Sequence, residues 1–361
     1  MLRAIPATLM RGGTSKGLYF NAADLPSNEA ARNAVLLAAM GSPDPRQIDG
    51  VGGAHPLTSK IAVLSPSDHP DADVDYLFLQ AAVNERQVSN SQPCGNILAG
   101  VGPWAVENGL IAALQGETRV RIRTINNGSL AVATVQTPGG IVEYEGDAAI
   151  DGVPGAAAPV SIEFLDIAGS NCGSLLPTGN IVDKFAGVEA TCIDNGMPVV
   201  LLRARDFGLT GDETPASLEA NDKLKSQIEA IRLEAGFSMN LGDVKAKTVP
   251  KMTLVSPPRG GGALSTRTFI PHRVHEAIGV LGAVSVAAAA ALPGSVAASV
   301  SKASAGWRRM DIEHPSGFFT VDLELEKDGE AFAVKRCALL RTARLLMRGE
   351  IYIPSAAWSA A

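Results

Sequence analysis

Residues 97–108 are apolar on almost every side when they are placed on a helix, and Gly109 is positioned to end that helix. A helix without a polar face cannot lie on a surface, so protein must surround it. Pro103 falls inside the stretch, where we expect a kink. Strand patterns separated by glycine-rich turns follow at 119–125, 130–137, 140–145 and 159–165. This combination predicts a sheet wrapped around a central helix.

The second half of the chain repeats this order. Residues 279–292 form another apolar stretch behind a polar loop, roughly 185 residues after Cys94. With 361 residues, 46% of them hydrophobic, the chain can bury two cores. We therefore predict an α/β (α+β) protein of two similar domains, each a mixed β-sheet rolled around a central buried helix. The starts of the two central helices are expected to face a shared cleft.

Charge and cysteine usage exclude several classes of protein. A net charge of −6 without basic runs gives no footprint for nucleic acid. No apolar run reaches the 18 residues of a membrane span. The four cysteines are far apart and form no CxxC pair, so neither a zinc site nor a disulfide framework is indicated. A cytoplasmic enzyme is the expectation.

Three features are candidates for chemistry, and each also has a structural interpretation. Cys94 precedes the central helix, whose start favours a thiolate and attracts carboxylates, although most unpaired cysteines are small buried hydrophobes. Lys60 follows a glycine-rich loop and precedes four apolar residues, where it could also extend from a strand end. Residues 10–17 combine glycines, hydroxyls and cations that suit anionic oxygens, but a hairpin turn has the same composition. Their spacing is not that of a Walker loop.

Several motifs taken together resemble the 2-methylaconitate and 4-oxalomesaconate isomerase family, within the diaminopimelate-epimerase-like superfamily. They are RGGTSKG at 11–17, DGVGG at 49–53, TSK at 58–60, CGN at 94–96, CIDNGMP at 192–198 and HPSG at 314–317. The resemblance runs over essentially the whole chain. Residues 10–17, 40–44 and 341–344 are most similar to the 4-oxalomesaconate tautomerases of gallate-type aromatic degradation.

The resemblance implies a domain at 1–182, joined by a C-terminal strand within about 348–361, and a second domain at 183–347. It implies a cofactor-free and metal-free site in the cleft between them. Lys60 and Cys94 fall on the family's catalytic pair. The amino-acid epimerases have a second cysteine before the second central helix, and residues 277–282 contain none, so a two-thiol racemase is not expected.

A lysine and one thiol suit the removal of a proton next to a carbonyl and its return elsewhere, which is a tautomerisation or an allylic isomerisation. The substrate implied is a small di- or tricarboxylate. The residues expected to bind its carboxylates are Arg11, Thr14, Ser15, Ser59, Gly95, Asn96, Asn195, Asn240, His272, Arg273 and Gly279.

Three other interpretations stay open at this point. The chain could be a 2-methylaconitate cis–trans isomerase of the methylcitrate cycle. It could be a non-catalytic accessory protein of an aconitase-like dehydratase, which the presence of both Lys60 and Cys94 argues against. An amino-acid epimerase is disfavoured by the missing thiol. A homodimer is compatible with the sequence, which does not determine the oligomeric state.

Overall fold

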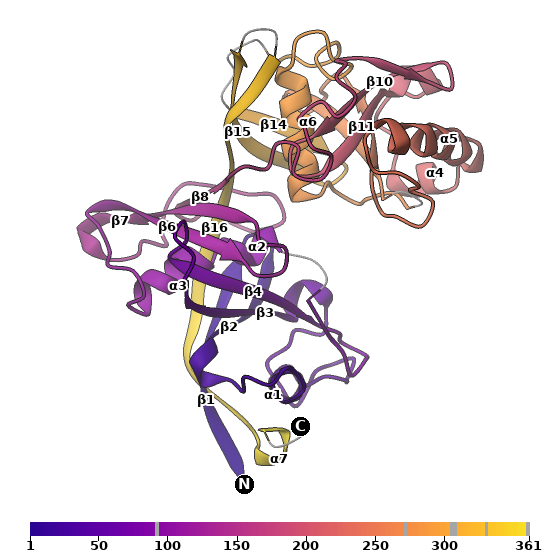
Figure 1. Ribbon diagram of the computed structural model, residues 1–361. Coiled ribbons are helices and arrows are strands. Elements are labelled where there is room, and N and C mark those ends of the chain that lie inside the picture. Colours follow the sequence, from indigo (N-terminus) through magenta and orange to yellow (C-terminus); the bar gives the residue numbers. More distant parts are fainter. Residues whose placement is uncertain (91–93, 271–272, 304–308, 329–330, 359–361) are drawn as a thin grey trace. The chain divides into compact units, whose positions relative to one another are not determined.

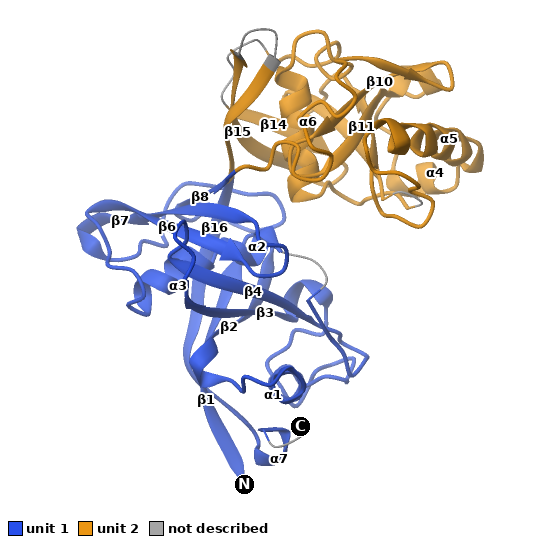
Figure 2. Ribbon diagram, in the orientation of Figure 1, with its two compact units in different colours: residues 1–165, 340–361 blue, residues 166–339 orange. Residues whose placement is uncertain are grey.

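The chain divides into two compact units in the computed structural model (Figure 2), which describes residues 1–90, 94–270, 273–303, 309–328 and 331–358. Unit 1 holds residues 1–165 and 340–361, and unit 2 holds residues 166–339. The predicted boundaries were 182/183 and 347/348. Residues 166–182 belong with unit 2 because Ala168 bridges Asn195 and the Asp194 carboxylate accepts hydrogen bonds from the backbone of Asn171 and Cys172.

The sheet of unit 1 closes on itself (Figure 1). Its strands are β1 (Leu2–Gly12), β2 (Ser15–Asn21), β3 (Lys60–Pro66), β4 (Val74–Ala81), β5 (Val88–Ser89), β6 (Gly116–Thr124), β7 (Leu130–Thr137), β8 (Pro159–Phe164) and part of β16 (Ala331–Pro354). They pair in the order β1-β2-β3-β4-β6-β7-β8-β16, and β16 also pairs with β1. The predicted rolled sheet is therefore present in this unit.

Two short helices fill the rolled sheet, α2 (Gly95–Leu98) and α3 (Val101–Glu107). Ile97, Trp104 and their neighbours pack in one cluster with inward side chains such as Tyr19 and Tyr76. The alternate strand residues form a second cluster with α1 (Glu29–Met40), which covers the outer face. Strands β2 and β3 are thus buried on both faces, which explains their nearly continuous apolar sequence, whereas β6 alternates between buried and exposed residues.

The prediction of one continuous helix over 97–108 is wrong. The helix is interrupted at 99–100, and Pro103 is the third residue of α3. A proline is tolerated in a first turn because that turn's N–H groups have no partner within the helix. Residues 140–145 are also not a strand, since Gly139 and Gly140 take left-handed φ values of 69° and 76° and end the extended chain.

Unit 2 has the strands β9 (Asp183–Phe185), β10 (Val188–Asp194), β11 (Pro198–Arg203), β12 (Lys251–Ser256), β13 (Leu264–Phe269), β14 (Arg309–His314), β15 (Gly317–Asp328) and the first part of β16, paired in that order. Its apolar helix α6 (Val280–Ala291) packs against β10, β11, β14 and β15. The amphipathic helix α5 (Asp222–Ser238) packs on a separate apolar cluster with β10, β11 and β12. The remaining helices are α4 (Pro215–Glu219), α7 (Ser355–Trp358), η1 (Ala22–Asp24), η2 (Pro56–Thr58), η3 (Pro138–Gly140) and η4 (Ala204–Phe207).

The two units share one order of strand pairings. From β1 to β8, successive pairs are antiparallel, parallel, antiparallel, parallel, antiparallel and antiparallel. From β10 to β16 the same six directions follow in the same order. The covering helix lies between the second and third strands in each series, and the central helix between the fourth and fifth. The predicted repeat of two similar mixed α/β domains is confirmed.

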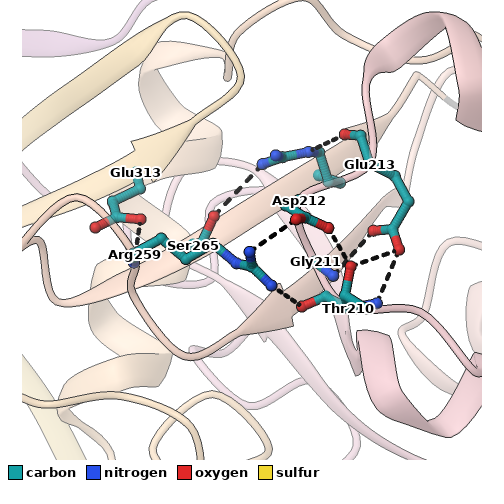
Figure 3. Close-up of polar contacts among 8 residues, drawn as sticks. Thr210, Gly211, Asp212, Glu213, Arg259, Ser265 and Glu313 are labelled. Atoms are coloured by element: carbon teal, nitrogen blue, oxygen red, sulfur yellow. Dashed lines mark hydrogen bonds and ion pairs between the residues drawn. The ribbon is translucent and has the colours of Figure 1, made fainter.

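A polar network braces the loops at one part of unit 2 (Figure 3). Arg259 pairs with Asp212 at 2.7 Å, and its backbone N–H donates to Glu313 at 2.8 Å. The Glu213 carboxylate accepts the Thr210 N–H at 2.8 Å and the next N–H in the chain at 2.9 Å. The carboxylates here accept hydrogen bonds from loop N–H groups that have no partner in a strand. The network therefore stabilises the loops.

None of the helices in the described ranges has the length and apolarity needed to cross a bilayer.

Candidate active site

Lys60 begins β3 on the inner face of unit 1. Ile61 and Val63 pack in the outer cluster with α1, and Ala62 packs in the inner cluster, so alternation along the strand directs Lys60 inward. The Lys60 ammonium lies 5.7 Å from the centre of the Phe78 ring, on the neighbouring strand β4. A strand end has therefore placed a cation beside the central helix.

Cys94 meets this lysine. It is the N-cap residue of α2, with extended backbone angles of φ −127° and ψ 103°, and its side chain is half-buried. The distance from Lys60 Nζ to Cys94 Sγ is 3.3 Å, although the two residues are 34 positions apart in the chain. Two groups that can each hold or release a proton are in direct contact, which is the geometry that acid–base catalysis requires.

Two buried tyrosines hold the start of α2, and the sequence patterns did not single them out. Tyr76 Oη donates to the Cys94 carbonyl at 3.1 Å, and Tyr19 Oη donates to the Ile97 carbonyl at 2.6 Å. Burial raises the pKa of both phenols well above the usual range, and the nearby Cys94 raises it further. Both hydroxyls therefore stay protonated and remain hydrogen-bond donors.

The glycine-rich loop after β1 lies against Asn96. A side chain at Gly13 (φ +52°) would place its Cβ 2.2 Å from Asn96 Oδ1, and one at Gly12 would lie 2.4 Å from the Asn96 carbonyl oxygen. The Thr14 N–H donates to Asn96 Oδ1 at 3.4 Å. Glycine is required here because the loop and α2 approach so closely. Thr14 and Asn96, both predicted to bind substrate, are thus brought together.

Ser15 and Arg11 have different surroundings. Ser15 is 2% exposed, and its hydroxyl has no hydrogen-bond partner among the described residues. Arg11 Nη1 donates to the Gly13 carbonyl at 2.9 Å and to the Thr342 hydroxyl at 2.9 Å. Burial lowers the pKa of Arg11, with a further contribution from Arg344. Arg11 braces the loop, whereas the Ser15 hydroxyl has hydrogen-bonding capacity left.

Ser59 is buried completely in the loop before Lys60. Its hydroxyl lies 2.8 Å from Gln47 Oε1 and 2.9 Å from the His55 carbonyl. Gln80 Nε2 donates to the Ser59 carbonyl at 3.1 Å. These contacts fix the entry into β3, and they occupy the Ser59 hydroxyl that was expected to meet substrate.

In unit 2, Asn195 lies beside the central helix. Its backbone N–H donates to Ser285 Oγ of α6 at 3.1 Å, and the residue is completely buried. Neither amide atom of its side chain has a partner among the described residues. Such a group is expected to have a missing partner, because an unpaired buried amide costs free energy. Gly279 is the exposed N-cap residue of α6, the position that Cys94 holds in α2. Gly95 is the first residue of α2.

The other residues of unit 2 that were predicted to bind substrate are Asn240, Arg273 and His272. Asn240 is exposed, takes a left-handed φ of 61° after α5, and donates from Nδ2 to the Cys172 carbonyl at 3.1 Å. That position ends the helix. Arg273 is exposed, and His272 lies outside the described residues. Among the described residues, no group of three His, Cys, Asp or Glu side chains is arranged to hold a metal ion.

Proteins of similar sequence include two named for oxalomesaconate. A (4E)-oxalomesaconate Delta-isomerase of a Novosphingobium species is 60% identical over 349 residues, which cover 96% of this chain and 97% of the relative. A 4-oxalomesaconate tautomerase of Pseudomonas putida is 57% identical, covering 98% of this chain and 97% of the relative. A 2-methyl-aconitate isomerase of Shewanella oneidensis is 35% identical, covering 97% of each chain.

Solved structures of similar fold include a crystal structure of methylitaconate-delta-isomerase. It is 35% identical, with a TM-score of 0.90 over 99% of this chain and 97% of that one. A hydroxyproline epimerase from Agrobacterium vitis, 16% identical, matches with a TM-score of 0.52 over 97% of this chain and 93% of its own. The predicted epimerase-like fold is confirmed. Residues 2–354 match the family described as PrpF protein. Since that match spans nearly the whole chain, and two relatives are more than half identical along it, the chain belongs to the PrpF protein family.

Proposed function

We propose that this isomerase acts on 4-oxalomesaconate without a cofactor, moving a proton from carbon to oxygen or to another carbon of the unsaturated oxo-tricarboxylate. The contact of 3.3 Å between Lys60 Nζ and Cys94 Sγ carries the proposal. The names of the two relatives more than half identical to the chain support the choice of substrate.

The name of the substrate describes a ketone joined through a methylene carbon to an unsaturated dicarboxylate. A proton on that methylene is acidified by both neighbours, because its loss leaves a dienolate whose charge spreads over the ketone oxygen and the far alkene carbon. Return of the proton to oxygen gives the enol, and its return to the far carbon moves the double bond. Tautomerisation and allylic isomerisation therefore share their first step.

Lys60 and Cys94 can perform this step together. One of the pair takes the methylene proton, and the other supplies a proton to the dienolate or stabilises its charge. Because the two groups are in contact, a proton can pass directly between them. The Phe78 ring, 5.7 Å from the Lys60 ammonium, lines the same side of the pair. The free hydroxyl of Ser15 and the amide of Asn96 are proposed to bind substrate carboxylates.

The substrate is tested by assaying the purified protein with 4-oxalomesaconate and with 2-methylaconitate side by side. We expect kcat/KM for 4-oxalomesaconate to exceed that for 2-methylaconitate by at least about 100-fold, a difference of about 2.7 kcal/mol in transition-state stabilisation. Proton NMR in D₂O identifies whether deuterium enters at carbon or only at oxygen. A higher kcat/KM for 2-methylaconitate would assign the chain to the methylcitrate reaction instead.

We also propose that the protein acts in the cytoplasm. Cys94 acts only as a free thiol, and a reducing compartment keeps thiols free.

A further inference from the structure

Unit 2 has a lysine at the position that corresponds to Lys60. Within their series of strand pairings, β3 and β12 both pair in parallel with the preceding strand and antiparallel with the next. Both strands follow a covering helix, and both begin with lysine, Lys60 in β3 and Lys251 in β12. The repeat of the fold therefore places a second cation at the equivalent strand start.

Lys251 also projects from the equivalent face. Met252 and Leu254 pack in the cluster with α5, so alternation along β12 directs Lys251 to the opposite face, which lies toward α6. This is the relation that Lys60 has to α1 and α2 in unit 1. Both lysines thus project toward the central helix of their own unit.

A histidine next to β13 is the second member of the candidate site in unit 2. His275 lies in the segment before α6, and its backbone N–H donates to the Thr268 carbonyl on β13, next to β12. Its Nδ1 accepts the Ala277 N–H at 2.9 Å, which leaves the proton of the neutral ring on Nε2. Burial lowers the pKa of His275, and the charge of Lys251 lowers it further. A lowered pKa favours the neutral ring, in which Nε2–H is a hydrogen-bond donor.

The ammonium of Lys251 has no acidic partner among the described residues, although the side chain is half-buried. Burial lowers the pKa of Lys251, and Arg232 adds to this effect. An unpaired, half-buried cation destabilises a fold unless an anion pairs with the cation. The unpaired amide of Asn195 lies at the same edge of the sheet, because it precedes β11, which runs parallel to β12 with Val199 opposite Lys251. Two unsatisfied polar groups at one edge indicate a ligand.

We propose that Lys251 and His275 form a carboxylate-binding site in unit 2, which takes one carboxylate of a di- or tricarboxylate. The class of ligand rests on the proposed function, whereas the site itself rests on the unpaired cation and on the repeat of the fold. The Lys251 ammonium and the His275 Nε2–H both donate to the carboxylate oxygens. Lys60 contacts the thiol at the N-cap of its central helix, and the corresponding N-cap in unit 2 is Gly279, so the two lysines of the repeat have separate tasks, one in proton transfer and one in binding.

Calorimetric titration of the full chain with tricarballylate tests the site, because this saturated tricarboxylate has no ketone or double bond to react. Lys251→Met should weaken binding by roughly 10–100-fold, the factor that corresponds to losing one charge-assisted hydrogen bond. Lys251→Arg, which keeps the charge, should bind within a few-fold of wild type. Lys245→Met removes an exposed lysine six positions earlier and should bind as wild type does.

A melting curve separates binding from a structural role. Lys251→Met should leave the melting temperature of the free protein unchanged or raise it, because the substitution removes an unpaired half-buried charge.

An unchanged dissociation constant for Lys251→Met would overturn the proposal, as would a wild-type protein that does not bind tricarballylate. A melting temperature lowered by several degrees, with equal loss of binding in Lys251→Arg, would show a structural lysine and also overturn it. If tricarballylate binds through Lys251 but 4-oxalomesaconate is not turned over, the site stands and the proposed function fails.

Discussion

Replacing Gly17 with alanine is expected to separate Lys60 from Cys94 and to remove most of the activity. Gly17 on β2 lies opposite Lys60 on β3. A Cβ at this position would lie 2.2 Å from the Lys60 carbonyl oxygen and 2.7 Å from its carbonyl carbon. Since carbon and oxygen approach to about 3.3–3.6 Å even in weak hydrogen bonds, the two strands must separate by about 1 Å.

A shift of that size at Lys60 lengthens the contact of 3.3 Å with Cys94 beyond hydrogen-bonding range. A misplacement of about 1 Å costs on the order of 10²-fold in rate, so kcat should fall by that factor. Overpacking of a buried strand pair should also lower the free energy of unfolding by about 1–3 kcal/mol. The assay is steady-state turnover of 4-oxalomesaconate, together with urea unfolding of the same preparations.

Gly349→Ala is the matched control, because Gly349 also lies in a strand and a Cβ there meets nothing within 4 Å. This variant should keep its rate and its stability. If Gly17→Ala retained kcat within about threefold of wild type and unfolded like Gly349→Ala, the reasoning from the 3.3 Å contact would be refuted.

Three further predictions concern single groups of unit 1. Lys60→Met should abolish turnover while circular dichroism and melting stay close to wild type, and a near-normal rate would remove the lysine from the mechanism. Cys94→Ser should lower kcat by about 10²–10⁴-fold, the range for a positioned acid–base group, and a smaller loss would make the thiol accessory. The Arg121 guanidinium beside Asp73 holds the pKa of that carboxyl below its usual range. Because the folded-state pKa is lowered, the stabilisation is present above the unfolded value of about 4 and is lost as the pH falls through the folded value. The melting temperature of wild type should therefore exceed that of Asp73→Asn at pH 6 and converge with it toward pH 2, and a difference independent of pH would contradict this assignment.

Much of the fold was predictable because apolar periodicity is local. The helices without a polar face required sheets around them, and the strand patterns at 119–125, 130–137 and 159–165 correspond to β6, β7 and β8. The single strand β16 was not predictable. A C-terminal strand was expected only within about 348–361, whereas β16 begins at Ala331 and includes Arg341, Arg344 and Arg348, which interrupt any apolar alternation. Their strand conformation comes from pairing with β1 and β15, which are distant in sequence.

The candidate site was predictable to a different extent. Lys60 and Cys94 were named from motifs, and the structure brings them into contact. Tyr76 was missed because a side-chain bond to the Cys94 carbonyl depends on how β4 lies against α2, which no local pattern encodes. Ser59 was expected to bind substrate, but its hydroxyl lies 2.8 Å from Gln47 Oε1 in the loop before β3, a contact between distant residues that no local pattern encodes.

The closure of unit 1 by β16 has a consequence for synthesis of the chain. Residues 1–165 leave the ribosome first, yet the part of β16 that joins β8 to β1 in unit 1 begins at residue 340, after all of unit 2. At about 5–20 residues per second, the intervening stretch of about 170 residues takes roughly 9–35 s to make. During that interval the nascent unit 1 has two open sheet edges and an incompletely covered apolar helix, which are features that chaperones recognise and that promote aggregation. Unit 2 can fold during this delay, and the first-made half of the protein is the last to be completed.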